Sequence, residues 1–107
     1  PMSEEYERIV MELVVNAGDG RSLAIQAIRE ARAGKFREAQ QLIDQCQEAL
    51  IRCHETQTEL IQSELQGNPV PVALLMVHAQ DHIMNAMTVK DLAIEMIEML
   101  KERSKEQ

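Results

Sequence analysis

The chain contains three long stretches in which apolar residues recur every three or four positions, the spacing of one helix face. The first begins after Ser3, a residue suited to cap a helix, and continues to Ala31. Two glycines around Asp19 interrupt it and either break the segment or let a kinked helix pass close to a neighbour; we expect the kink. Ala33-Gly34-Lys35 then predicts a helix end and a chain reversal.

The second helix is predicted from Phe36 to Leu65 and the third from Val72 to Arg103. The intervening Gln66-Gly67-Asn68-Pro69-Val70-Pro71 must be a loop, because its prolines lack amide donors and disfavour helix at the preceding residues. Three long helices joined by short turns predict an all-α fold. We expect an antiparallel three-helix bundle forming a single domain over residues 1–107, with Pro1 an added residue because it precedes Met2.

The third helix carries more apolar surface than one small bundle can cover. One group of its residues suits an internal core: Leu75, Ile83, Ala86, Leu92, Ala93, Ile97 and Leu100. A second group lies toward other sides: Val77, Met84, Thr88 and Met99. This second surface predicts self-association through parallel third helices, as a dimer or a trimer with cyclic symmetry.

Composition narrows the possible partners. Aromatic residues make up 2% of the chain, so a core of aliphatic residues and seven methionines is expected. The net charge of −7 argues against nucleic-acid binding, which needs a basic surface. No apolar run reaches the roughly 20 residues of a membrane span and no signal peptide is evident, so we expect a cytoplasmic protein without direct membrane insertion.

Cys46 and Cys53 lie about 10 Å apart along one helix, too far to pair, and are expected to be buried thiols.

Polar chemistry is concentrated at His78-Ala79-Gln80-Asp81-His82, inside the otherwise apolar third helix. His78 and His82 lie one helical turn apart, and Asp81 is adjacent to both. A neutral imidazole is a nucleophile, so either His78 or His82 can accept a phosphoryl group. Gln80 is then a candidate hydrogen-bond donor to the phosphoryl oxygens, and Asp81 an orienting base or a metal ligand. Alternatively, both histidines are interface residues satisfied by Asp81 and water. A zinc-protease helix is disfavoured because Ala79, not glutamate, follows His78.

The segment from His78 to Met84 resembles the active-site signature of the lactose/cellobiose-type IIA component of the phosphoenolpyruvate-dependent sugar phosphotransferase system. Further matching motifs run along almost the whole chain: Ala17-Gly18-Asp19, Arg21-Ser22, Gly34-Lys35-Phe36 with Ala39, and His54-Glu55-Thr56-Gln57-Thr58. The resemblance implies a homotrimer with the third helices around its axis. It also implies that His78 accepts a phosphoryl group from the histidine-containing phosphocarrier protein and passes it to a cysteine of the IIB component of a β-glucoside (cellobiose/lactose-type) permease.

The resemblance also implies that three copies of Asp81 meet at the trimer axis and share Mg²⁺ or another divalent cation. Converging carboxylates repel one another unless a cation neutralises them, and oxygen ligands suit a hard ion. Gln80 and His82 match the motif as residues that support His78. Ile83 stands where leucine is familiar and Gly20 where alanine is more frequent, while the matching His54 is interpreted as structural.

The partner surface is expected to be an apolar patch around His78, with Met76, Met84 and Met87 as contributors, although core or trimer packing is the expected role of at least two of them. Few lysines or arginines lie near His78 in the sequence, as expected for a group that must be passed on. The competing hypothesis is a helical adaptor that binds a peptide, because Gly34-Lys35-Phe36 and Ala39 also resemble a tetratricopeptide turn. That hypothesis lacks a second repeat and leaves the histidine cluster unexplained.

Overall fold

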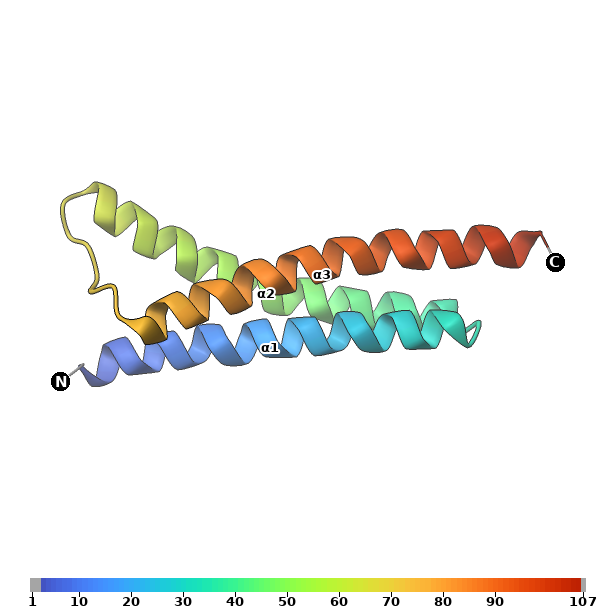
Figure 1. Ribbon diagram of the computed structural model, residues 1–107, viewed down its shortest axis with the longest axis horizontal. Helices are drawn as coiled ribbons and strands as arrows, with labels where there is room; N and C mark the ends of the chain where they lie inside the picture. The colour runs from blue at the N-terminus through green and yellow to red at the C-terminus, as the bar shows by residue number, and fades with distance from the viewer. Residues whose placement is uncertain (1–2, 107) are drawn as a thin grey trace.

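A computed structural model describes residues 3–106 and contains three helices in this range: α1 (Glu4–Arg32), α2 (Phe36–Leu65) and α3 (Leu74–Lys105). α1 and α3 run in the same direction, and α2 runs in the opposite direction, back from the end of α1 to the start of α3 (Figure 1). The protomer is elongated, with extents of 58 × 23 × 19 Å. The predicted all-α three-helix bundle is therefore confirmed, while the interpretation of Pro1 lies outside the described residues.

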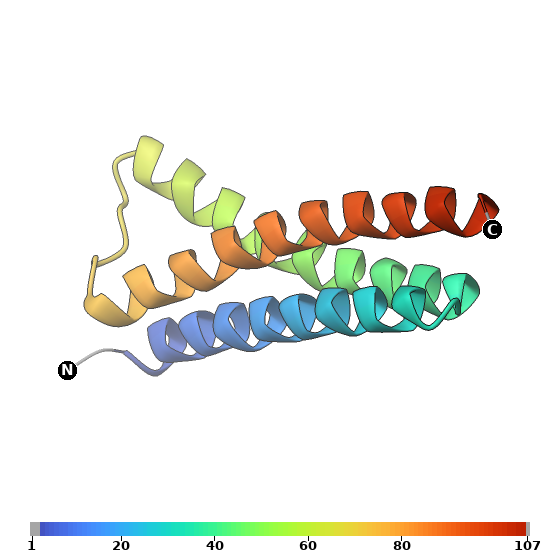
Figure 2. The ribbon, with the colours of Figure 1, turned by 45° about the vertical axis from the view of Figure 1, so that its right-hand side comes forward.

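The first helix is continuous through its glycine pair, so the predicted kink is wrong. Figure 2 shows α1 without an abrupt bend, and Gly18 and Gly20 both lie within it. The helical hydrogen bonds persist because packing against both neighbouring helices offsets the low helix propensity of glycine. The expected close approach is correct: a Cβ added at Gly20 would lie 2.8 Å from Cδ2 of Leu50.

Both chain reversals use glycines in the left-handed region, Gly34 with φ 80° and Gly67 with φ 91°. Gly34 follows α1 as predicted. α3 begins two residues later than predicted, because the chain before it is held extended beside α1. The hydroxyl of Tyr6 donates a hydrogen bond of 2.7 Å to the carbonyl oxygen of Pro71, which fixes this segment.

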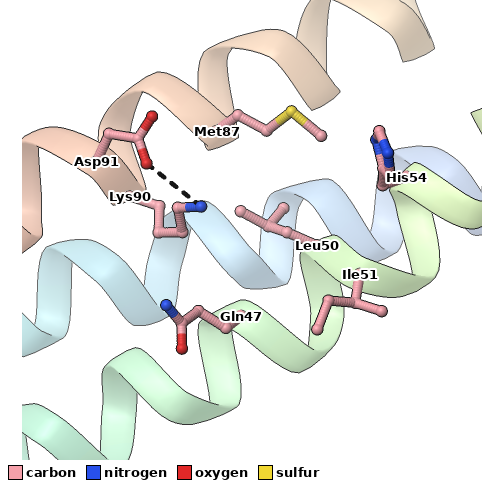
Figure 3. A pocket seen from close by; sticks show the side chains of 7 residues that line it. All are labelled: Gln47, Leu50, Ile51, His54, Met87, Lys90 and Asp91. Carbon is pink, nitrogen blue, oxygen red and sulfur yellow. Dashed lines mark ion pairs between the residues drawn. The ribbon is translucent and has the colours of Figure 1, made fainter.

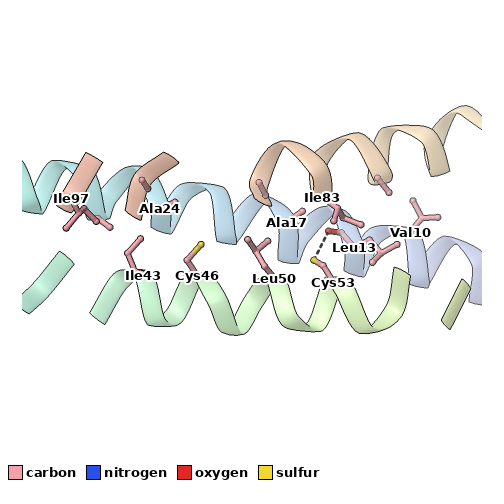
Figure 4. Close-up of a cluster of buried hydrophobic side chains, with 14 of the residues drawn as sticks. Val10, Leu13, Ala17, Ala24, Ile43, Cys46, Leu50, Cys53, Ile83 and Ile97 are labelled. Atoms are coloured by element: carbon pink, nitrogen blue, oxygen red, sulfur yellow. Dashed lines mark hydrogen bonds between the residues drawn. The ribbon is translucent and has the colours of Figure 1, made fainter. Parts of the chain in front are cut away.

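Small and aliphatic side chains fill the core between α1 and its two neighbours (Figure 4). Its fully buried members include Leu13 and Ile83, with alanines along both α1 and α3 that allow close helix approach. Cys46 and Cys53 are buried and free, as predicted. Leu92 was expected in this core but is 51% exposed, because it lies on the same outward face of α3 as Asp81. Within residues 3–106, no helix is long and apolar enough to cross a membrane.

Candidate functional site

His78 and His82 form a contacting pair on α3. Their Nε2 atoms lie 3.0 Å apart, and the rings meet edge to face with centroids 4.4 Å apart and an interplanar angle of 88°. A distance of 3.0 Å fits a hydrogen bond in which one ring donates its proton and the other accepts with its lone pair. His78 is exposed, whereas His82 is half-buried toward α1. The pair therefore presents an accessible, hydrogen-bonded imidazole on a rigid helix.

Gln80 lies on the flank of α3 opposite to His78 and does not contact His78 in the same chain. Its Oε1 accepts a hydrogen bond of 2.7 Å from Nε2 of Gln57 on α2, and its own Nε2 lies 3.5 Å from Sδ of Met76. A rotation of about 100° per residue already separates positions 78 and 80 by about 160° around the helix. The structure thus brings His78 and His82 together and leaves Gln80 apart from them.

Asp81 is exposed and forms no hydrogen bond or ion pair with any residue in 3–106. Within one chain, Asp81 therefore satisfies neither histidine. The described part of one chain also contains no group of three or more His, Cys, Asp or Glu residues that could hold a metal. A metal site with three such side chains at Asp81 would therefore need ligands from more than one copy.

A hollow of about 250 Å³ lies beside His82 between α3 and one stripe of α1. The stripe contributes Gly18, Arg21, Ser22, Ile25, Gln26 and Arg29. Arg21 and Arg29 thus lie in space beside His82, although few basic residues lie near His78 along the sequence. α1 supplies these residues because it runs beside α3, with Ile83 level with Leu13 and Ala17 (Figure 4).

A larger groove of about 540 Å³ separates α2 from α3 and contains His54 (Figure 3). The ion pair between Nζ of Lys90 and Oδ1 of Asp91, 3.2 Å long, lies along it with Met87. His54 faces this groove rather than the histidine pair. Its assignment as a structural residue stays a prediction.

The three methionines near the pair differ in accessibility. Met76 is 5% exposed and belongs to the core, and Met87 is partly buried against it. Met84 is 53% exposed on the Gln80 flank. Packing is thus the role of two of the three, and Met84 alone has a largely free side chain.

The family model described as "PTS system, Lactose/Cellobiose specific IIA subunit" matches residues 8–101. The chain belongs to this family. It is 49% identical over 98 residues to the lichenan-specific phosphotransferase enzyme IIA component of Bacillus subtilis (strain 168), covering 92% of this chain and 89% of that protein.

Two solved structures of IIA proteins share the fold. The crystal structure of the PTS cellobiose-specific enzyme IIA from Bacillus anthracis superposes with a TM-score of 0.94 at 42% identity, covering 99% of this chain and 97% of that one. The solution structure of the IIA(Chitobiose)-HPr complex of the N,N'-diacetylchitobiose branch of the Escherichia coli phosphotransferase system gives 0.81 at 38% identity, covering 95% and 99%. The chain is thus a phosphotransferase-system IIA component, and membership in this family disfavours the helical adaptor.

The signature residues lie on α3, so the sequence predicts no chemistry for α1. Arg21 and Ser22 match the family only as sequence positions, and their place beside His82 depends on how two distant helices align. The direction of Gln80, in contrast, was readable from the sequence, because two residues along a helix point to nearly opposite sides.

Proposed function

We propose that this IIA component is a phosphoryl carrier that accepts the group on His78. The observation that carries the proposal is the exposed imidazole of His78, whose Nε2 lies 3.0 Å from Nε2 of His82. The proposed donor is the histidine-containing phosphocarrier protein, HPr, since a IIA relative forms a complex with HPr. The proposed acceptor is a cysteine of the IIB component of a β-glucoside permease of the cellobiose/lactose type.

The transfer step needs a free lone pair on His78. Nε2 of His78 attacks the phosphorus of the donor phosphohistidine, a new N–P bond forms, and the N–P bond to the donor ring breaks, returning its electron pair to that ring. Before attack, His82 carries the shared proton, and its hydrogen bond to His78 opens so that the lone pair on Nε2 of His78 faces the phosphorus. As the phosphoryl group arrives, the N–H of His82 is placed to donate to one of its oxygens and so stabilise the charge.

An uncovered face of α3 supports a trimer. Several side chains within about 40° of Asp81 around the helix are apolar and more than half exposed: Leu74 84%, Val77 51%, Leu92 51% and Met99 60%. Exposed apolar side chains that recur along one face of a helix indicate an interaction site. Three parallel α3 helices would cover it and bring three Asp81 carboxylates together.

Gln80 gains a role in such a trimer. His78 and Gln80 lie on opposite flanks of the face centred on Asp81, at about +60° and −100° from it. In a cyclic trimer, the flank of one α3 that carries His78 meets the flank of the next α3 that carries Gln80. Gln80, held by Gln57 at 2.7 Å, therefore supports the His78 of a neighbouring copy rather than its own.

Asp81 is suited to a divalent cation because its carboxylate is exposed and has no ion-pair partner within residues 3–106. Three copies would hold Mg²⁺, which neutralises their mutual repulsion. We expect Mg²⁺ to raise the thermal stability of the trimer and chelation to lower it, with both effects lost in Asp81→Ala. Asp91→Ala is the matched control on another flank of α3, and stability that ignores chelation would contradict the metal site.

Phosphorylation is tested with phosphoenolpyruvate, enzyme I and HPr, followed by intact-mass spectrometry. We expect an acid-labile phosphoryl adduct on the wild type that is absent from His78→Ala. His54→Ala, which changes the histidine in the α2–α3 groove, should retain it. Absence of an adduct on the wild type, or its persistence in His78→Ala, would refute the proposed function.

A further inference from the structure

The hollow beside His82 differs in charge from the rest of this acidic protein. The chain contains 18 acidic and 11 basic residues, yet none of the seven residues lining this hollow is acidic. Arg21 and Arg29 contribute guanidinium groups, and Ser22 and Gln26 contribute uncharged hydrogen-bond donors. Such a lining favours an anion.

Arg21 is the arginine placed at the histidine end of the hollow. Figure 4 shows Ile83 of α3 level with Leu13 and Ala17 of α1, so the neighbouring His82 lies toward the Gly18 end of the hollow. Along α1, Arg21 stands about 12 Å closer to that end than Arg29, at 1.5 Å per residue. Within residues 3–106, Arg21 has no ion-pair partner that would hold its guanidinium elsewhere. Gly18 has no side chain to fill the hollow at this end, and no atom lies within 4 Å of the position that a Cβ would occupy there.

We propose that Arg21, assisted by Ser22, binds the phosphoryl oxygens carried by His78, so that α1 supplies a phosphoryl-binding subsite next to the carrier helix. This inference rests on the proposed function and extends it to a second helix. The guanidinium fork matches the geometry of phosphoryl oxygens, and a charge-assisted hydrogen bond there stabilises the phosphorylated state. His82 stands between the two parts, 3.0 Å from His78 and in the lining of the hollow.

The subsite is expected to shift the phosphoryl-transfer equilibrium. Contacts that stabilise the phosphoryl group on this chain shift the equilibrium from phosphorylated HPr toward the phosphorylated chain. Removal of those contacts shifts it back toward phosphorylated HPr. We expect Arg21→Gln to lower the equilibrium ratio of phosphorylated to free chain by about tenfold at a fixed ratio of phosphorylated to free HPr. Arg21→Lys, which keeps the charge and loses the fork, should give an intermediate decrease.

The experiment mixes phosphorylated HPr with each variant and measures both phosphoproteins by intact-mass spectrometry, with peptide mapping to show that the adduct stays on His78. Arg29→Gln is the matched control, because it removes an arginine from the far end of the same hollow. Circular dichroism checks that each variant is folded. If Arg21→Gln unfolds, the Arg21→Lys ratio decides.

Two results would overturn the subsite: an Arg21 variant with the wild-type ratio, or an equal decrease in Arg29→Gln, which would indicate a general effect of charge. Absence of any adduct on the wild type would instead refute the proposed function and the subsite with it. The two failures are therefore distinguishable in a single series.

Discussion

Nε2 of His78 and Nε2 of His82 lie 3.0 Å apart on successive turns of α3, with the two rings at 88° to each other. Only one proton fits between them in a hydrogen bond, so one ring must donate and the other accept. The less exposed ring, His82, faces the α1 hollow, and the more exposed ring, His78, faces solvent. The pair thus separates an accessible nucleophile from a positioned donor.

Replacement of His82 tests this division of roles. We expect His82→Leu to slow phosphoryl transfer from HPr by about ten to a hundredfold, because no donor then meets the incoming phosphoryl oxygens. His82→Asn should slow it less, since its amide retains an N–H donor. Quench-flow measurement of adduct formation checks this, and a His82→Leu rate equal to the wild type would assign His82 a purely structural role.

Subunit mixing tests whether Gln80 acts across the trimer interface. Gln80→Leu should accept the phosphoryl group about tenfold more slowly, because its neighbour's His78 loses an amide donor. Unfolding and refolding it with an excess of His78→Ala surrounds each Gln80→Leu chain with intact Gln80 residues. The transfer rate per functional His78 should then recover toward that of the wild type.

The control for this experiment mixes Gln80→Leu with an excess of the His78→Ala/Gln80→Leu double variant, in which no intact Gln80 is available. No recovery is expected there. If the mixture with His78→Ala also shows no recovery, Gln80 does not support a neighbouring His78.

The buried thiols predict a dependence of stability on alkaline pH. Burial raises the pKa of Cys46 and of Cys53, only partly opposed by the charges of Lys90 and Arg52. The unfolded thiols therefore lose protons first, so the free energy of unfolding is unaffected below the ordinary thiol pKa of 9.0 and decreases as pH rises above it. The decrease approaches about 1.4 kcal/mol per pH unit for each thiol.

Denaturant unfolding at several pH values between about 8 and 10 measures this slope. The Cys46→Ala/Cys53→Ala variant should be less stable throughout because it leaves cavities, yet its stability should fall less steeply with pH. Parallel slopes for the variant and the wild type would show that other groups cause the alkaline loss.

Local signals made the fold and the histidine pair predictable. Ser3 and the Pro69–Pro71 loop act on their own neighbours, and His78 and His82 share a face through the period of one helix, so none of these depends on distant packing. The α1 side of the site was not predictable in this way. Its position depends on which residue of α1 lies level with His82, and that alignment is set by contacts far apart in sequence, such as Tyr6 with Pro71.

The two glycines of α1 also could not be distinguished from the sequence, because their sequence context is similar while their surroundings in the fold differ. A Cβ at Gly18 would have no atom within 4 Å, whereas a Cβ at Gly20 would lie 2.8 Å from Cδ2 and 3.0 Å from Cγ of Leu50. Only packing against α2 distinguishes them. The predicted kink treated both as weak points, but Gly20 is a contact position and Gly18 an open one.

Alanine at each glycine should therefore have opposite effects on stability. Gly18→Ala should stabilise the protein by about 0.5–1 kcal/mol, because alanine has the higher helix propensity and meets no obstacle. Gly20→Ala gains the same propensity but forces the buried Leu50 to move, at a cost of about 1–3 kcal/mol, so a net loss of about 1 kcal/mol is expected. In the Gly20→Ala background, Leu50→Ala should remove that clash. Leu50→Ala should therefore cost less stability there than it does in the wild type. Denaturant unfolding at one fixed protein concentration measures Gly18→Ala, Gly20→Ala, Leu50→Ala and the Gly20→Ala/Leu50→Ala double variant. Equal effects at the two glycines would contradict the close approach of α1 and α2 at Gly20.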